Sequence, residues 1–374
     1  MPARETESSG DLTVELLPTA NSDGEEEGIG VDEMLERFAG EFGPWQLRQF
    51  LLTSIAWALN SIHTMAVVFA DREPAGPDPC GAASRAGEWA GSTVEEWHLA
   101  CGGERYKVGL AQSAFFAGSM IGAAIFGHLS DSFLGRKGAL TVASGLNATF
   151  GLLTAFSPSF SVYAAFRLLT GVSTGGVGLS AFVLATEPIG RSRRAAAAMS
   201  SFYFSSAGAV ALSAIALLIP SWRHLYVATS IPSLLFVLLA IPFISESPRW
   251  HLVHRNPSAA MSIIRAIANS NGSFVPGALS LTLDAYPGKV SPGAAAAVSS
   301  SIIDVLRSRL TRSRLVLAVL INLLGSIVYY GLTLNVGNLG SNLHFSVILN
   351  AVAEVPAYML TAMAVSGLNQ LNYY

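Results

Sequence analysis

Two charged residues, Arg167 and Glu354, lie inside stretches of the sequence that are otherwise strongly apolar. A charge inside a lipid bilayer is costly, so such residues are usually functional. The carboxylate of Glu354 could attract a cationic solute beside a cavity, and Pro356 would loosen the helix around it. Glu354 could instead be a structural partner of Arg167 or of a backbone donor. Arg167 itself could serve proton coupling or a structural pairing between helices.

Polar and aromatic side chains in other apolar stretches extend this candidate site. Asn60 is a polar residue at mid-depth, suited either to lining a cavity or to joining two helices by hydrogen bonds. Tyr329 and Tyr330 offer aromatic faces that attract quaternary ammonium groups, although aromatic residues in membrane helices more often face lipid or fill packing space. We predict that Asn60, Tyr329, Tyr330 and Glu354 bind the substrate.

The composition excludes most other classes of function. The chain has 374 residues, of which 51% are hydrophobic and 13% charged, whereas soluble domains carry about 25% charged residues. A soluble enzyme is therefore excluded, and a net charge of −3 is too small to indicate a nucleic-acid partner. The sequence shows no catalytic triad, metal-ligating cluster or phosphate-binding loop, so we expect no catalytic residue, no metal and no cofactor.

The apolar residues form eight blocks that are long enough to cross the hydrocarbon core of a bilayer, which is about 30 Å thick. Each block is predicted to be a helix, because lipid offers no hydrogen-bond partner to an open backbone. The blocks cover residues 49–69, 108–129, 140–156, 161–184, 195–219, 225–244, 315–334 and 343–365. The predicted fold class is an all-α membrane protein with about eight transmembrane helices, embedded in a lipid bilayer.

These spans divide the chain into five regions. They are an acidic N-terminal segment (1–48), a six-helix bundle (49–246), a long loop (247–314), a pair of helices (315–365) and a tail (366–374). The loops after the second, fourth and sixth spans hold 13 Lys and Arg residues, against five in the loops on the opposite side. By the positive-inside rule the basic loops and both termini are cytoplasmic.

Two smaller features belong to the loops and the N-terminal segment. Apolar residues at helical spacing predict a short amphipathic helix over 31–38, before the first span. Cys80 and Cys101 both fall in the first non-cytoplasmic loop, where an oxidising compartment would allow them to pair. The alternative is two unpaired thiols.

The loop after the second span carries a motif of glycines and charges. Gly127 would allow close helix approach, Asp131 offers an anion at the membrane edge, Gly135 permits the turn, and Arg136 and Lys137 hold the loop in the cytoplasm. An ordinary basic turn could have the same glycines and charged residues. The segment resembles the loop 2–3 signature of the major facilitator superfamily, although Asp131 and Gly135 stand four residues apart rather than three.

Two acid–base pairs strengthen that resemblance. Glu246 and Arg249, in the segment SESPRW, and Glu187 with Arg191 resemble signatures of sugar porters and organic ion transporters at the ends of the sixth and fourth spans. Charged networks at helix ends can hold one conformation and release it in another. Each pair alone could be a static surface salt bridge, which contributes under about 1 kcal/mol.

Three further segments favour the organic ion transporters over the sugar porters. Residues 96–101 (EWHLAC) and 329–335 (YYGLTLN) resemble organic cation/carnitine transporters of the plant type, and the seventh span lacks the paired glutamines expected of sugar porters. Arg167 matches the arginine motif of the fourth span, and Glu354 matches a carboxylate of the eighth. The resemblance implies alternating-access transport of organic cations or carnitine-like solutes, with protons as an alternative coupling ion.

The resemblance also implies twelve spans, of which this sequence shows eight. A non-transporting truncated form, or a modulator of a full-length transporter, is therefore an alternative function. A sugar/proton symporter is the other alternative. The expected location is the plasma membrane or the vacuolar membrane.

Overall fold

The computed structural model describes residues 28–72, 91–101, 103–277, 279–281, 307, 309–334 and 342–371. Long helices dominate these residues, joined by short helical turns and one pair of two-residue strands. The elements are β1 (Gly28–Ile29), α1 (Val31–Met34), η1 (Leu35–Ala39), α2 (Pro44–Ala70), α4 (Thr93–Glu96), α5 (Tyr106–Asp131), α6 (Gly135–Thr154), α7 (Phe160–Thr186), α8 (Arg191–Leu218), α9 (Trp222–Leu235), η3 (Phe236–Ala240), η4 (Ile241–Phe243), α10 (Pro248–Val253), α11 (Pro257–Ser270), β2 (Ser280–Leu281), α13 (Arg309–Leu334) and α14 (Leu343–Leu371).

Every predicted span is helical, and the all-α fold is confirmed. By length and composition, seven helices among the described residues could cross a membrane. The third predicted span, residues 140–156, corresponds to α6, which is not among those seven. This helix is only 20 residues long, begins with Gly135, Arg136 and Lys137, and carries several Ser, Thr, Asn and Gly residues that lower its hydropathy.

The helices are longer than the apolar blocks that predicted them. Helix α13 begins at Arg309, six residues before its predicted start, and α14 continues to Leu371 instead of ending at Val365. Polar and charged residues at the edge of a membrane remain compatible with helical backbone. Hydropathy therefore marks the lipid-facing part of each helix and not its ends.

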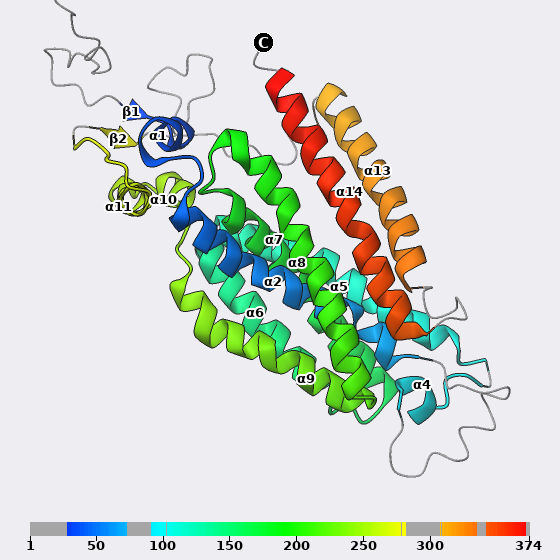
Figure 1. Ribbon diagram of the computed structural model, residues 1–374. Helices are drawn as coiled ribbons and strands as arrows, with labels where there is room; N and C mark the ends of the chain where they lie inside the picture. The colour runs from blue at the N-terminus through cyan, green and yellow to red at the C-terminus, as the bar shows by residue number, and fades with distance from the viewer. Residues whose placement is uncertain are drawn as a thin grey trace, which may run out of the picture.

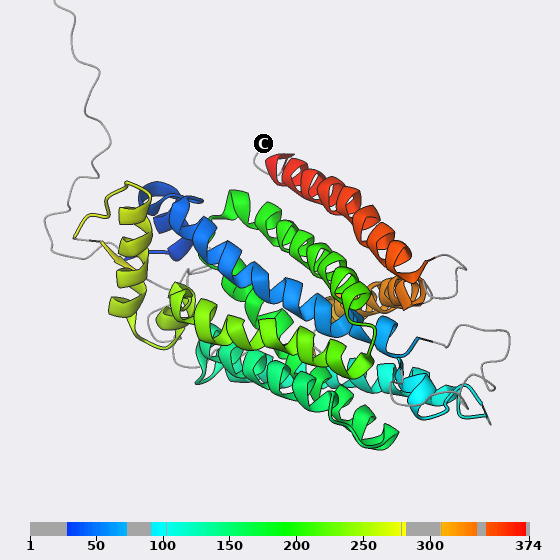
Figure 2. The same cartoon turned by 60° about the horizontal axis from the view of Figure 1, so that its bottom comes forward.

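Helix α7 lies at the centre of the bundle. Helices α5 and α6 pack on it, α2 lies against both α7 and α8, α9 packs on α6, and α14 packs on α8 (Figure 1). Figure 2 shows that α1, α10 and α11 gather at one end of the bundle, here called the α1 end, and α4 lies at the other, the α4 end. The described parts of the three basic loops meet at the α1 end, where Arg136 contacts Glu187 and Glu246 and where Arg191 and Arg249 contact Asp32.

Helices α5 and α7 approach each other closely through glycine. A Cβ added at Gly122 would lie 1.8 Å from the backbone oxygen of Val172, and one added at Gly118 would lie 2.1 Å from that of Leu168. Small residues four apart on one helix allow such backbone contact between membrane helices. These glycines therefore set the spacing between α5 and α7. At Gly127 a Cβ would meet a side chain, that of Leu179, at 3.2 Å.

Residues 28–39 form part of a small apolar unit at the α1 end. The predicted amphipathic helix is present as α1 and η1, with Val31, Met34 and Leu35 buried and Glu33 exposed. Its apolar side packs against α11, and β1 pairs in parallel with β2, so that Gly28 lies opposite Ser280. The helix thus buries its apolar face against protein.

Candidate functional site

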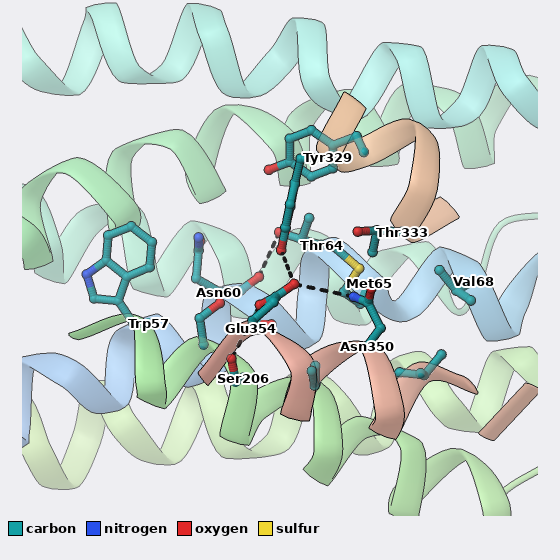
Figure 3. A pocket seen from close by; sticks show the side chains of 16 residues that line it. Trp57, Asn60, Thr64, Met65, Val68, Ser206, Tyr329, Thr333, Asn350 and Glu354 are labelled. Carbon is teal, nitrogen blue, oxygen red and sulfur yellow. Dashed lines mark hydrogen bonds between the residues drawn. The ribbon is translucent and has the colours of Figure 1, made fainter. Parts of the chain in front are cut away.

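A pocket lies between the six-helix bundle and the last two helices. Four elements line it, namely α2 (Trp57, Asn60, Ser61, Thr64, Met65, Val68), α8 (Ser205, Ser206, Ala209), α13 (Tyr329, Tyr330, Thr333) and α14 (Val347, Asn350, Ala351, Glu354). We call it the Glu354 pocket (Figure 3). All four residues predicted to bind substrate, Asn60, Tyr329, Tyr330 and Glu354, line it. The structure therefore brings together residues up to almost 300 positions apart in the sequence.

The carboxylate of Glu354 accepts four hydrogen bonds. The hydroxyl of Tyr329 and the amide of Asn350 donate to Oε1 at 2.8 and 3.3 Å. The hydroxyls of Tyr358 and Ser206 donate to Oε2 at 2.8 and 3.3 Å. Figure 3 shows the Tyr329, Asn350 and Ser206 side chains converging on Glu354. Hydrogen bonds to a carboxylate stabilise the charged form, which offsets the cost of removing it from water.

Arg167 does not supply this stabilisation. Its guanidinium donates to the backbone oxygen of His63 and to Oε1 of Gln112, each at 3.2 Å, and its Cζ lies 4.2 Å from the ring centroid of Phe115. Among the described contacts of Glu354, none is with Arg167. The alternative that these two residues form a structural pair is therefore not supported.

Two polar atoms on the α2 side of the pocket have no hydrogen-bond partner among the described residues. They are the indole Nε1 of Trp57 and the side-chain Oδ1 of Asn60, both buried. A buried polar atom without a partner costs about 1–3 kcal/mol. Sequence reasoning missed Trp57, although an indole N–H within an apolar span was a signal.

Aromatic rings also lie around the carboxylate, some of them behind the pocket wall. Tyr358 stacks on Phe202 with centroids 5.5 Å apart, and Phe202 lies 5.2 Å from Trp57. On the other side, the rings of Tyr329 and Tyr330 are 5.0 Å apart. A negative charge beside several aromatic faces is the arrangement that attracts organic cations.

The charged motif residues form a second site at the α1 end, the Arg136 network. The guanidinium of Arg136 contacts Asp131, and its Nη2 lies 3.5 Å from Oε1 of Glu187. Glu246 accepts hydrogen bonds from the backbone nitrogens of Arg136 at 3.0 Å and Lys137 at 3.1 Å. The carboxylate of Glu246 thus caps the start of α6, where the helix dipole favours negative charge.

Gly135 makes that cap possible. Its φ is +72°, a conformation that side chains with a Cβ rarely adopt, and an added Cβ would lie 2.3 Å from Oε2 of Glu246. The predicted turn at Gly135 is therefore present, and it holds the loop close to α10. The segments around Asp131, Glu187 and Glu246, separate in the sequence, meet at this one turn.

Arg191 and Arg249 belong to a different cluster. Both contact the carboxylate of Asp32 on α1, together with Arg194, and Nε of Arg191 lies 3.0 Å from Oδ2. Burial by itself would raise the pKa of Asp32, but the charges of Arg249 and Arg194 and the hydrogen bonds from Arg194 and Arg191 outweigh it and hold the pKa below its usual value. We call this the Asp32 cluster. It ties α1 to α8 and α10.

Asp71, at the α4 end, was also missed by the sequence analysis. Its Oδ1 accepts hydrogen bonds from Thr93 at 2.6 Å and from Tyr163 at 2.8 Å, and the Tyr163 hydroxyl lies 3.0 Å from that of Tyr226. Burial raises the pKa of Asp71 to about 6, although these hydrogen bonds and the charge of Arg167 act in the opposite direction. Its position directly after the apolar block was the available signal.

The predicted disulfide involves one described residue. Cys101 is not a free thiol, and it follows Trp97, whose ring lies 5.3 Å from that of Trp222. Cys80 lies outside the described residues. The pairing of Cys80 with Cys101 stays a prediction. Within the described residues, no group of three or more His, Cys, Asp or Glu side chains could hold a metal ion.

Comparisons with known proteins point to one family. The family model described as "Sugar (and other) transporter" matches residues 80–365. The chain is 52% identical to organic cation/carnitine transporter 4 of Arabidopsis thaliana, over 94% of this chain and 69% of that protein. It is 31% identical to organic cation/carnitine transporter 3 of the same plant, over 91% of this chain and 69% of the relative.

A solved structure shows the same fold at low sequence identity. A proton:xylose symporter of the major facilitator superfamily, bound to 6-bromo-6-deoxy-D-glucose, superposes with a TM-score of 0.56 at 16% identity. The match covers 86% of this chain and 68% of the symporter. At this identity the likeness concerns the fold alone. This chain therefore belongs to the sugar and other transporter family, within the major facilitator superfamily, and is a multi-pass membrane transporter similar to plant organic cation/carnitine transporters.

Proposed function

We propose that this chain carries small organic cations or carnitine-like solutes across a membrane by alternating access. The observation that carries the proposal is the position of Glu354, whose carboxylate stands on the wall of a pocket formed by α2, α8, α13 and α14. A partly desolvated carboxylate beside aromatic rings attracts positive charge. The names of the plant relatives, which refer to organic cations and carnitine, agree with this chemistry.

Within this proposal the pocket residues have separate roles. Glu354 supplies the charge, while Tyr329 and Tyr330 supply aromatic faces. Asn60 offers its side-chain amide to a polar group of the solute. The solute would lie between the six-helix bundle and the last two helices, so that movement of one group against the other would change its access.

The charged residues at the α1 end are proposed to control that movement. Asp131, Arg136, Glu187 and Glu246 hold the ends of α5, α6, α7 and the start of α10 together. Breaking these contacts would free the helix ends to separate, as charged networks do in conformational switches. The residues proposed to act in this movement are, in and beside the Arg136 network, Gly127, Asp131, Gly135, Arg136, Lys137, Glu187 and Glu246, and, in the Asp32 cluster, Arg191 and Arg249. Arg167, within the bundle, is proposed to act in the same movement through its contacts with His63 and Gln112.

The driving force is proposed to be the membrane potential acting on the cation, with a proton gradient as the alternative. The membrane potential contributes about 2.3 kcal/mol per charge for each 100 mV. The membrane would be the plasma membrane or the vacuolar membrane. No chemical change of the solute is proposed.

Uptake of labelled tetraethylammonium and carnitine by a transport-deficient host that expresses this chain tests the proposal. Saturable uptake that competing hexoses do not reduce is the expected result. If hexoses reduced the uptake and organic cations did not, the result would instead favour a sugar/proton symporter. Its substrate would be neutral, so Glu354 would not act by attracting the charge of the substrate. Absence of uptake, with changed transport by a co-expressed full-length relative, would favour a modulator.

A further inference from the structure

The carboxylate of Glu354 has no free lone pair in this structure. An ionised carboxylate offers about four acceptor positions, two on each oxygen. Tyr329 and Asn350 occupy Oε1, and Tyr358 and Ser206 occupy Oε2. Each of the two closest donors, at 2.8 Å, is a tyrosine hydroxyl.

The occupation of all four acceptor positions of Glu354 affects the binding of a cation according to whether the cation carries an N–H group. A cation with an N–H group must displace one of the four donors before it can hydrogen-bond to the carboxylate. Otherwise its N–H must turn to a neutral acceptor elsewhere on the pocket wall, and a neutral acceptor binds an ammonium N–H more weakly than a carboxylate does. A quaternary ammonium group has no N–H, so it gains attraction from the charge and from the aromatic faces while all four hydrogen bonds remain.

The two tyrosines are also held in place by their surroundings. The ring of Tyr358 is stacked on Phe202 at 5.5 Å and lies edge-on to Tyr203 at 6.0 Å. The ring of Tyr329 lies edge-on to Tyr330 at 5.0 Å. These contacts restrict the rings and keep the hydroxyls on Glu354.

We infer that Tyr329 and Tyr358 determine specificity in the Glu354 pocket: by occupying the carboxylate, they favour cations without N–H donors over cations that carry one. This inference rests on the proposed function, because it requires that the pocket binds organic cations. It assigns a role to Tyr358, which does not line the pocket itself, and it explains why the hydroxyls are present as well as the rings.

The test compares tetramethylammonium with trimethylammonium, which differ by one methyl group and one N–H. Dissociation constants are measured by calorimetry on the purified full chain in detergent. We expect the wild-type protein to bind tetramethylammonium about tenfold more tightly, because trimethylammonium gives up hydrogen bonds to water without gaining one to the carboxylate. In the Tyr329→Phe and Tyr358→Phe variants a lone pair becomes free, and the ratio should fall to about one.

Tyr203→Phe is the matched control, because it removes a tyrosine hydroxyl that is not among the four donors to Glu354. Its ratio should stay at about ten. A wild-type ratio near one, or a ratio unchanged in the double variant Tyr329→Phe/Tyr358→Phe, would overturn the inference while leaving cation binding intact.

If the proposed function itself is wrong, the result is different: the wild-type protein binds neither cation, although its cooperative thermal unfolding shows that it is folded. If a tyrosine variant does not fold, the wild-type ratio alone decides. A value of about ten then supports the inference and a value near one refutes it.

Discussion

The hydroxyl of Ser206 on α8 donates a hydrogen bond to Glu354 on α14, over 3.3 Å and across 148 positions of sequence. Through Tyr329, the same carboxylate is joined to α13. Glu354 therefore connects the six-helix bundle with both of the last helices. Movement of α8 or α13 relative to α14 would change how many donors the carboxylate has, and with it the strength of its attraction for a cation.

Replacing the charge at the pocket should weaken cation binding. We expect Glu354→Gln to raise the dissociation constant for tetramethylammonium by about 10- to 100-fold, because attraction by a carboxylate is lost. Calorimetry on the purified chain measures this. Glu36→Gln, at an exposed position on η1, is the control and should leave the constant unchanged. Equal affinities in wild type and Glu354→Gln would remove Glu354 from the site.

The Asp32 cluster should stabilise the α1 end. In Asp32→Asn, three arginines would face one another without their shared carboxylate, so we expect the free energy of unfolding to fall by about 1–3 kcal/mol. Thermal unfolding in detergent measures the loss. Glu33→Gln, which breaks only the exposed pair with Arg37, should cost much less. Similar losses in both variants would contradict the importance of the cluster.

The same cluster makes a prediction about acid. Because the pKa of Asp32 is lowered in the folded chain, its stabilising contribution is present at neutral pH. That contribution is lost as the pH falls through the folded pKa, below the ordinary value of 3.8. The stability difference between wild type and Asp32→Asn should therefore be constant from pH 7 to 5 and shrink below pH 4. A difference that vanishes already at pH 6 would be inconsistent with this account.

Asp71 should have the opposite pH dependence. Its pKa in the folded chain is about 6, above the ordinary 3.8, so the folded state binds the proton more tightly than the unfolded state. Stability should rise as the pH falls from 7 towards 4. In Asp71→Asn this component should be absent. Thermal unfolding of both proteins is measured across this pH range. At each pH the stability of the variant is subtracted from that of the wild type, which cancels the contributions of the histidines that both proteins share. Parallel curves would refute the prediction.

The glycine contact between α5 and α7 should not tolerate a methyl group. Gly122→Ala would place Cβ 1.8 Å from the backbone oxygen of Val172, so α5 and α7 would have to separate. We expect a loss of about 1–3 kcal/mol or more. Gly109→Ala on the same helix meets no atom within 4 Å and should be neutral or slightly stabilising. Thermal unfolding that ranks the two variants the other way would disprove the close contact.

Much of the fold could be predicted from hydropathy. The eight apolar blocks all became helices, and the amphipathic stretch before the first span became α1 and η1. The four candidate binding residues were chosen for their chemistry within apolar segments, and they share one pocket. Hydropathy did not predict the ends of α13 and α14, because polar residues beyond the lipid can continue a helix.

The partners of the charged residues could not be predicted. Asp32 and Asp71 lie at the ends of segments, where a carboxylate is ordinarily solvated, and nothing local indicates that Arg249 or Tyr163 will reach them. Arg191 was expected to act with Glu187, but it contacts Asp32, while Glu187 contacts Arg136. These contacts depend on the rotation of each helix about its axis.

The amino-acid sequence by itself determined that the chain is a bundle of membrane helices with its basic loops on one side, and it indicated which residues carry unusual chemistry. The helices follow from the transfer free energy of each apolar segment, which depends on the composition of that segment alone. The common side of the basic loops follows from the alternation of the spans and from the difference in Lys and Arg content between the loops. The tertiary structure decided which donors saturate Glu354 and which arginines surround Asp32. Those contacts depend on how distant helices pack, as at Gly122, where a single missing Cβ sets the distance between α5 and α7.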